Sequence, residues 1–513
     1  MKRYKLMFLI IVICVIPLFA QSQNKSEAFQ KKGLFYKTPL LKPKYPSYNL
    51  AATYLLKEKA RKGDPFAQHE LGIRYILGVG IPKDSLKAAY WIKQAAAKKL
   101  PAANFNYAIM LSNGIGVEWN PFEAFKNFEI SAESGMEQAQ YIVGLNYVDN
   151  LIVSKDFKKA YYWLKKSSDK GFEEAKKVLI ELSKNNKIAI DDSLTQENEY
   201  RNPKANLSSN IATIDNFELD FYDFQKDTLS NTDEKKYLSK IIKTNTSELK
   251  RILKIDSQNS YKMPKDTSAN GLIDFAAQSG SPEALLLKGR FLENGIGIEK
   301  NEIEAASNFL KAFSFGSFKA AEYLLKLSRE KKFYNNLETE IRHNNANAMY
   351  VWAGLVALGM DYTLTEKQAF ELLVKARKQN HINSIIELGL AYYNGTLIEK
   401  DSIKAIEYLN EAAALGSSEA EVRLVFFKIK ENPNMVLKSE INILQKYANQ
   451  GSVLATAALA FCYENGLSVA KRKAKASKLY RKAAQRGNEA AYNSLRAMYD
   501  AIRPDEEKFK IYF

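Results

Sequence analysis

A small residue recurs along this chain at a nearly constant spacing of 36 residues, and this spacing restricts the possible fold more than any other feature. A fixed period of this size is typical of stacked supersecondary units, each of which contacts only its neighbours. It therefore favours an elongated array of repeats over a compact catalytic core. The series consists of Ala67, Ala103, Ala139, Ala175, Ala284, Ala320, Ala348, Ser384, Ala420, Ala455 and Ala491.

The clearest repeat, residues 63–100, contains two helical patterns. Ala67 and Leu71 lie four residues apart, on one face of a first helix. Gly78 ends this helix, and Asp84 is typical of the N-cap of the next one. The second helix is indicated by apolar residues at helical spacing, namely Ala88, Trp91, Ile92, Ala95 and Ala96.

The order of these residues resembles the Sel-1-like repeat, a relative of the tetratricopeptide repeat. Residues 63–96 match its pattern nearly throughout, including Lys87 and Trp91. The resemblance covers residues 47–184 and 266–503, and it implies a right-handed, superhelical all-α solenoid of about ten repeats in two arrays. Members of this family generally act as non-catalytic scaffolds or adaptors, so the resemblance implies protein or peptide partners.

The N-terminus has the pattern of a secretory signal peptide. Three basic residues within the first five precede an apolar run from Leu6 to Ala20. We expect cleavage after residue 20. The alternative is an uncleaved membrane anchor, but a spanning helix needs about 20 apolar residues and this run is shorter. Residues 21–46 contain three prolines and are expected to form a tether. Residues 504–513 are expected to form a C-terminal tail.

After export, the chain would carry a positive charge surplus and could form no intramolecular disulfide bond. The formal net charge is +17, and removing Lys2, Arg3 and Lys5 leaves a surplus of about +14. This surplus favours acidic partners, and nucleic acid is excluded as a partner of an exported chain. Only Cys462 would remain after cleavage, so we expect a bacterial periplasmic or outer-envelope location, or secretion, with no membrane span in the mature chain.

Residues 185–265 interrupt the repeats and are rich in Asn, Ser, Thr, Asp and Lys. Such a segment buries too little apolar surface to offset its ordering entropy, so we expect it to be largely disordered. Within it, residues 234–256 have the spacing of one or two short helices that dock on the array. Residues 216–224 are aromatic and acidic, which fits a partner-binding motif, a pseudo-ligand of the chain's own basic groove, or a short packed strand. The candidate binding residues there are Phe217, Phe221, Tyr222 and Phe224.

Three other irregularities interrupt the pattern of the repeats. Trp119 lies in an interhelical loop, either as an exposed aromatic contact or folded back onto the array. The step from Ala320 to Ala348 is only 28 residues, which predicts a local kink. A basic run in another loop is either a partner contact or a solvated loop. Its candidate residues are Lys471, Arg472 and Lys473.

No residue pattern indicates catalysis, a cofactor or a metal. His69, His343 and His381 have no metal-ligand spacing, and the recurring glycine pairs lack the context of a phosphate-binding loop. We therefore expect a non-catalytic scaffold that binds partners on the concave face, lined by the first helix of each repeat. A cell-wall or polysaccharide binder and an activating subunit of an envelope enzyme remain as alternatives.

Overall fold

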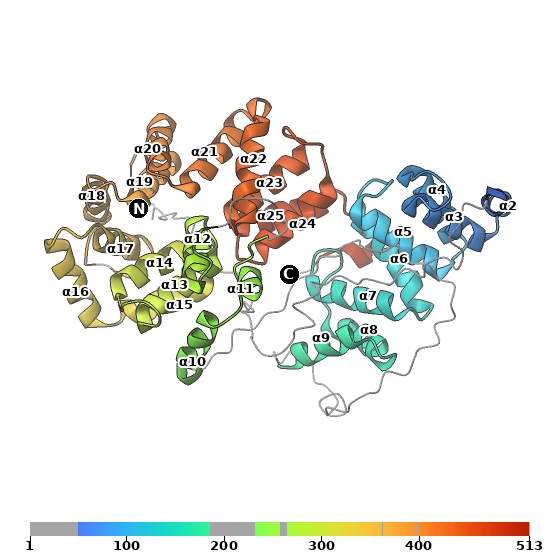
Figure 1. Cartoon of the computed structure of the whole chain (residues 1–513), viewed down its shortest axis with the longest axis horizontal. Helices are drawn as coiled ribbons and strands as arrows, with labels where there is room; N and C mark the ends of the chain where they lie inside the picture. Colours follow the sequence, from blue (N-terminus) through green and yellow to red (C-terminus); the bar gives the residue numbers. More distant parts are fainter. Residues whose placement is uncertain (1–49, 185–230, 257–263, 362, 396–397, 512–513) are drawn as a thin grey trace. The chain divides into compact units, whose positions relative to one another are not determined.

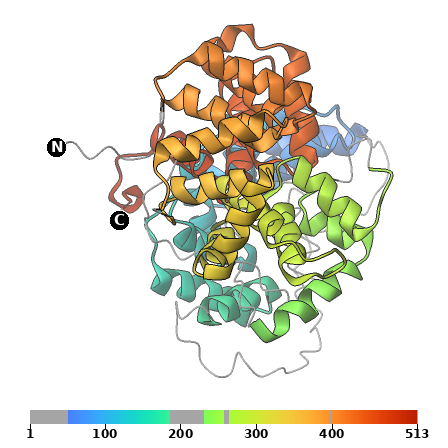
Figure 2. The same cartoon turned by 90° about the vertical axis from the view of Figure 1, so that its left-hand side faces the viewer.

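The computed structural model describes residues 50–184, 231–256, 264–361, 363–395 and 398–511. All regular secondary structure within these ranges is helical, and most helices lie side by side in successive pairs (Figure 1 and Figure 2). The expected all-α repeat fold is therefore confirmed.

Several expectations fall on other parts of the chain. The signal peptide at 1–20, the tether at 21–46 and most of the insertion, residues 185–230, lie outside the described residues. They remain predictions from the sequence.

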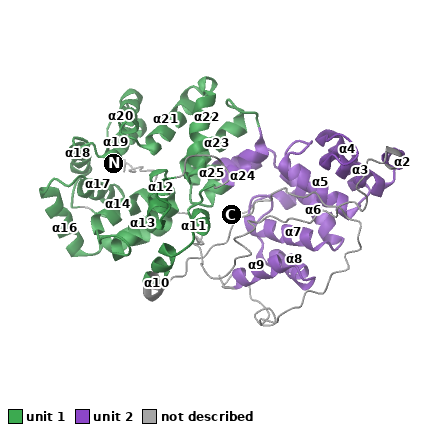
Figure 3. Ribbon diagram, in the orientation of Figure 1, with its two compact units in different colours: residues 1–22, 227–471, 482–493 green, residues 23–226, 472–481, 494–513 purple. Residues whose placement is uncertain are grey.

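The described residues form two compact units (Figure 3). Within the described ranges, unit 1 comprises residues 231–471 and 482–493, and unit 2 comprises residues 50–184, 472–481 and 494–511. The last repeat and the C-terminal tail thus contribute to unit 2 with the N-terminal repeats. The expected array boundaries, which followed chain order, stay predictions from the sequence.

Unit 2 contains four pairs of helices from the N-terminal part of the chain. They are α2 (Leu50–Arg61), α3 (Pro65–Leu77), α4 (Ser85–Ala97), α5 (Pro101–Asn113), α6 (Pro121–Glu133), α7 (Glu137–Asp149), α8 (Phe157–Asp169) and α9 (Glu173–Lys184).

The rest of the helices follow from residue 231 onward. They are α10 (Asn231–Ile242), α11 (Thr246–Ile252), α12 (Ala269–Gln278), α13 (Pro282–Asn294), α14 (Glu302–Ser314), α15 (Phe318–Ser328), α16 (Lys331–Arg342), α17 (Ala346–Ala357), α18 (Glu366–Arg377), α19 (Ile382–Asn394), α20 (Ser402–Ala414), α21 (Ser418–Glu431), the short 3₁₀ helix η2 (Pro433–Met435), α22 (Lys438–Asn449), α23 (Val453–Asn465), α24 (Lys473–Ala484), α25 (Glu489–Asp500) and the 3₁₀ helix η3 (Glu507–Phe509).

The two helices of a repeat approach each other closely at a glycine on the first helix. A Cβ atom added to Gly72 would lie 2.4 Å from Ile92 Cγ1, and one added to Gly289 would lie 2.4 Å from Phe309 Cε1. Both distances are shorter than van der Waals contact, so these positions do not accept a side chain without moving the helices. The small residues of the 36-residue series serve the same packing. All are almost completely buried: Ala67, Ala103, Ala139, Ala175, Ala284, Ala320, Ala348, Ser384, Ala420, Ala455 and Ala491.

Polar caps and glycines fix where the helices of a repeat end and begin. Gly78 ends α3 with a left-handed backbone, at φ 73°, which glycine adopts without steric strain. The Asp84 carboxylate then accepts a hydrogen bond from Lys87 N at 3.0 Å, which confirms the predicted N-cap of α4. Equivalent side-chain caps begin other second helices, at Asn120, Asp156, Asn301 and Asp401.

The end of the expected insertion is part of the folded repeats. Leu238 and Ile241 of α10, and Leu249 of α11, are buried in a core that also contains Leu272 of α12. This agrees with the prediction of short docking helices within residues 234–256. The folded part of unit 1 therefore begins before the expected boundary at residue 266.

A buried ion pair connects the last repeat to the third repeat within unit 2. Arg481 Nη1 lies 2.6 Å from Asp149 Oδ2, and the two side chains are 5% and 3% exposed. Arg481 also donates a hydrogen bond to Tyr499 Oη, and the Tyr499 ring meets Trp119 edge to face, with centroids 5.3 Å apart. Residues more than 300 positions apart therefore form one core.

The C-terminal tail, expected only as an appendage, packs on the same unit. Phe509 is fully buried against Phe122 and Phe125 of α6, with ring centroids 5.1 and 6.2 Å away. Arg503 donates hydrogen bonds to the carbonyl oxygens of Leu151 and Ile152. Ion pairs complete the contact, from Lys508 to Glu129 and from Lys126 to Glu506.

This contact accounts for a departure of the third repeat from the common pattern. Its interhelical loop lacks the glycine pair, and Asn150 takes the left-handed position there at φ 56°. The loop residues Leu151 and Val153 are buried, and the carbonyl oxygens of Leu151 and Ile152 accept hydrogen bonds from Arg503. The loop is thus built to receive the C-terminus.

Removing one partner of the buried ion pair is expected to destabilise unit 2 strongly. Asp149→Ala leaves the Arg481 guanidinium buried without its counter-charge, which costs about 3–5 kcal/mol. Hydrogen exchange of the α5–α7 amides measures this loss. The control, Asp169→Ala, removes an exposed partner of Lys165 and should cost less than about 1 kcal/mol. Equal losses in the two variants would contradict the buried role of Asp149.

Removing the buried ring of Phe509 is expected to release the C-terminal tail from unit 2. Phe509→Ala removes a fully buried ring, for which losses of about 3–5 kcal/mol are typical. Because opening becomes easier, trypsin should cleave at Lys508 and Lys510 faster than in the unmodified chain. Phe66→Ala, at a ring that is 69% exposed, is the matched control and should leave cleavage unchanged. Unchanged cleavage in Phe509→Ala would show that the tail is not held by its ring.

Acidification is expected to weaken the packing around His69. This side chain is buried and accepts a hydrogen bond from Asn106 Nδ2 at 2.8 Å; burial lowers its pKa from 6.5 to about 4. Between pH 6.5 and pH 4, His69 is therefore protonated in the unfolded chain but not in the folded one. The free energy of unfolding is highest above pH 6.5 and decreases toward pH 4, by up to about 3 kcal/mol. His69→Gln should lose this part of the pH dependence. Denaturation of both proteins at several pH values measures the difference, and identical slopes would contradict the assignment.

Candidate functional site

The shortened repeat gives unit 1 a local departure from regular stacking. Its helices α15 and α16 are joined by a two-residue connection rather than by a glycine loop. The next helix, α17, packs directly on α14, where a Cβ atom added to Gly354 would lie 2.7 Å from Leu310 Cδ1. The kink expected from the 28-residue step stays a prediction, and the departure from regular stacking lies between α14 and α17.

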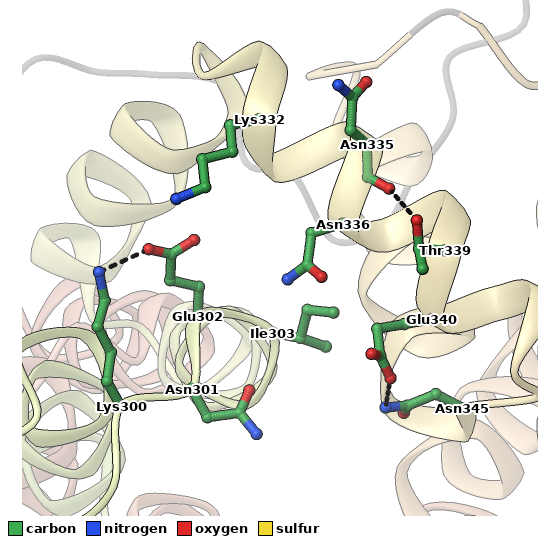
Figure 4. A pocket seen from close by; sticks show the side chains of 10 residues that line it. All are labelled: Lys300, Asn301, Glu302, Ile303, Lys332, Asn335, Asn336, Thr339, Glu340 and Asn345. Atoms are coloured by element: carbon green, nitrogen blue, oxygen red, sulfur yellow. Dashed lines mark hydrogen bonds and ion pairs between the residues drawn. The ribbon is translucent and has the colours of Figure 1, made fainter.

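A cavity of about 620 Å³ lies at this irregularity (Figure 4). The start of α14, the exposed side of α16 and the N-cap of α17 line it, and it is open to solvent. Nine of its ten lining side chains are polar, and Ile303 is the exception. The lining residues are Lys300, Asn301, Glu302, Ile303, Lys332, Asn335, Asn336, Thr339, Glu340 and Asn345.

Several polar groups of the cavity are held in place by hydrogen bonds. Asn345 caps α17 through its side-chain oxygen, and its Nδ2 donates to Glu340 Oε2 at 2.8 Å. Asn301 caps α14 in the same way. Lys300 pairs with Glu302 at 2.8 Å, and this pairing raises the pKa of Lys300. These contacts hold in place the side chains at the start of α14 and those between α16 and α17.

Three other polar side chains of the cavity, those of Lys332, Asn335 and Asn336, have no partner within the described residues. All three lie on α16. Figure 4 shows the Asn336 amide above Ile303 and the Lys332 amine directed toward the side of the cavity formed by α14. The cavity thus presents an amide and a cation that are available to a ligand.

The residues singled out from the sequence lie elsewhere. Trp119 is only 6% exposed and packs on Tyr499, so it is folded back onto the array and is not an exposed contact. Lys471 and Arg472 are exposed and Lys473 is half-buried, which agrees with either a solvated loop or a partner contact. The aromatic–acidic candidates lie outside the described residues: Phe217, Phe221, Tyr222 and Phe224.

The sequence reasoning located the short repeat but named no residue of the cavity. The available signals were the adjacent pair Asn335 and Asn336 on a helix and the pair Asn344 and Asn345 before the next one. Asparagine is unfavourable in helix interiors, so two asparagines on α16 indicate a local role for their side chains. The sequence does not show that α14 lies beside α16, so these asparagines alone did not indicate a cavity.

A second polar cluster lies within the packing of unit 1. Glu419 of α21 lies 2.5 Å from Lys311 Nζ and 2.8 Å from Arg423 Nε. Burial raises the pKa of Glu419, but the two cations outweigh this effect and lower it overall. Burial, together with the charge of Glu419, raises the pKa of nearby Glu387. None of these residues lines the cavity, and the paired charges favour a structural role.

The remaining candidates for chemistry also have structural roles. His381 caps α19 through Nδ1, and burial and the charge of Lys311 lower its pKa to about 4. The Cys462 thiol is fully buried, and burial raises its pKa to about 12, which makes it a poor nucleophile. In the described residues, no group of three or more His, Cys, Asp or Glu side chains is placed to hold a metal ion. No helix in the same ranges combines the length and apolar character needed to cross a membrane.

Two solved structures are similar to this chain. A protective antigen of uropathogenic Escherichia coli with a Sel-1-like repeat fold aligns at a TM-score of 0.31 and 19% identity, over 86% of this chain and 81% of the antigen. A Sel1 repeat protein from Oxalobacter formigenes aligns at a TM-score of 0.24 and 35% identity, over 25% of this chain and 96% of that protein. Both TM-scores are too low to define how the repeats of this chain stack.

Curated relatives match only parts of the chain. The chitin synthase regulator SKT5 of Saccharomyces cerevisiae is 27% identical over 266 residues, which are 47% of this chain and 38% of the yeast protein. The DAP3-binding cell death enhancer 1 proteins of Rattus norvegicus and Mus musculus are 30% and 31% identical over 106 residues, 21% of this chain and 21% of each relative. The chain therefore spans well under half the length of these relatives.

The Sel1 repeat model matches the chain six times, and each matched segment contains the paired helices described above. The matched segments are residues 65–100, 101–136, 137–172, 282–314, 382–417 and 453–488. Because the same pattern recurs at six places, each of them a pair of helices, the chain belongs to the Sel-1-like repeat family.

Proposed function

We propose that the protein is a non-catalytic scaffold that binds partner proteins or peptides in a bacterial cell envelope. The observation that carries this proposal is the recurrence of the Sel1 repeat, whose family generally mediates protein interactions. A stack of preformed helix pairs offers a surface that loses little conformational freedom on binding. The first helices of successive repeats are the proposed contact face, as the family resemblance implies.

The non-catalytic part of the proposal is supported by the chemistry of the described residues. The thiol of Cys462 and the imidazole of His69 are buried and engaged in packing. The Glu419 carboxylate of the polar cluster is paired with Lys311 and Arg423. The envelope location is supported by the sequence pattern of residues 1–20 alone.

Similarity to a chitin synthase regulator favours one second candidate. That relative is named for regulating an enzyme, and the match covers 266 residues. This chain would then be a regulatory subunit that binds an envelope enzyme through its repeats. Both candidates require a specific protein partner, so one experiment addresses them together.

In-cell crosslinking of the tagged chain, followed by mass spectrometry, is the test. A paired variant lacks residues 190–226, a deletion that ends before α10 because that helix is part of the core of unit 1. We expect the same discrete proteins to be captured by both chains, since the repeats form the contact face. An envelope enzyme among them would select the regulatory candidate.

Other outcomes contradict parts of the proposal. Loss of all partners in the deletion variant would move recognition to the aromatic–acidic segment 216–224. Capture of no specific protein by either chain would contradict the scaffold function and favour a cell-wall or polysaccharide ligand. Turnover of a substrate by the purified chain would contradict the non-catalytic assignment.

A further inference from the structure

We infer that the cavity between α14 and α16 is a binding site for an extended, polar peptide segment that carries an acidic residue. This inference rests on the proposed function as a binder of proteins, and it adds a second contact site to it. The cavity is formed by second helices and an N-cap, so it is separate from the proposed first-helix face.

The size of the cavity fits a ligand of several chemical groups. Its volume of about 620 Å³ falls within the range of about 300–1,000 Å³ that is typical of ligand sites. The space lies at the shortened repeat, where α17 packs directly on α14 with Gly354 against Leu310.

The composition of the lining disfavours small apolar molecules and ligands that bind by ring stacking. Sites for small organic molecules are mostly apolar, whereas Ile303 is the one apolar side chain here. The lining contains no aromatic ring on which a sugar or a nucleobase could stack. What remains is a ligand that is held mainly by hydrogen bonds and charge.

Amide side chains are suited to the backbone of a peptide. An asparagine carries both a donor and an acceptor, as does every peptide unit other than one preceding proline. Asn336 presents its amide above the floor of the cavity and has no partner within the described residues. An extended segment can pair its N–H and C=O groups with this amide without any requirement on its own side chains.

The charges of the cavity set the polarity of the segment. Lys300 and Glu302 pair with each other. Glu340 keeps its negative charge, but the Asn345 amide holds its carboxylate on the side of the cavity opposite Lys332 (Figure 4). Lys332 is the one lining cation without a partner in the described residues, and it is directed toward the cavity. An acidic side chain of the bound segment would supply its counter-charge.

The test selects phage-displayed random dodecapeptides on the full chain and measures the affinity of the enriched peptides by fluorescence anisotropy. We expect enriched peptides with at least one acidic residue. Lys332→Glu should weaken their binding at least about tenfold, because an attractive charge pair becomes a repulsive one. Asn336→Leu should weaken it similarly. The matched control is Lys331→Glu, the same change on the adjacent, exposed residue of α16 that does not line the cavity, and it should alter affinity less than about twofold.

Circular dichroism confirms that each variant is folded before binding is compared. Equal affinities in Lys332→Glu, Asn336→Leu and the control would overturn the inference, as would enrichment of peptides without acidic residues. Binding of an N-acetylglucosamine trisaccharide that Asn336→Leu abolishes, with no peptide enriched, would assign the cavity to a glycan instead. If in-cell crosslinking captures the same partners with Lys332→Glu while the enriched peptides bind it undiminished, the scaffold function stands and the peptide site fails.

Discussion

The structure depends on the close approach of the two helices within each repeat. A glycine on the first helix, such as Gly72 or Gly289, leaves no room for a Cβ atom beside the facing side chain of the second helix. Buried alanines at the 36-residue spacing extend this close packing from one repeat to the next. Because each repeat contacts mainly its neighbours in the stack, an irregularity in one repeat changes the local surface without disrupting the rest of the array.

The specific features of this protein arise where the repeat pattern fails. In the third repeat, the loop without a glycine pair buries Leu151 and binds Arg503 of the C-terminal segment. In the shortened repeat, α17 packs directly on α14, and a polar cavity lies beside α16. The loop of the third repeat thus binds the chain's own C-terminal segment, and we propose that the cavity of the shortened repeat binds a partner.

The sequence was sufficient for the elements whose signals are local. The spacing of small residues predicted the paired helices, and Asp84 was correctly identified as an N-cap. The apolar pattern before residue 256 predicted α10 and α11. These features depend on residues a few positions apart, and their physical causes can be read in any one repeat.

Features that depend on distant residues could not be predicted in this way. Nothing near Asp149 indicates that it pairs with Arg481, because their ion pair exists only once the last repeat packs in unit 2. The same packing buries Trp119, which a loop position alone left open to solvent or to the core. The cavity was missed because it requires the position of α14 as well as the asparagines of α16.

The central claim is that the repeats form a framework on which partner proteins are held. Hydrogen exchange of the full chain, with and without a partner purified from cells, tests it most directly. The account predicts slower exchange in first helices of neighbouring repeats and in the turn that begins α14, with the α6 and C-terminal contact unchanged. Exchange that is identical throughout the repeats in the two samples, despite a stable complex, would contradict it.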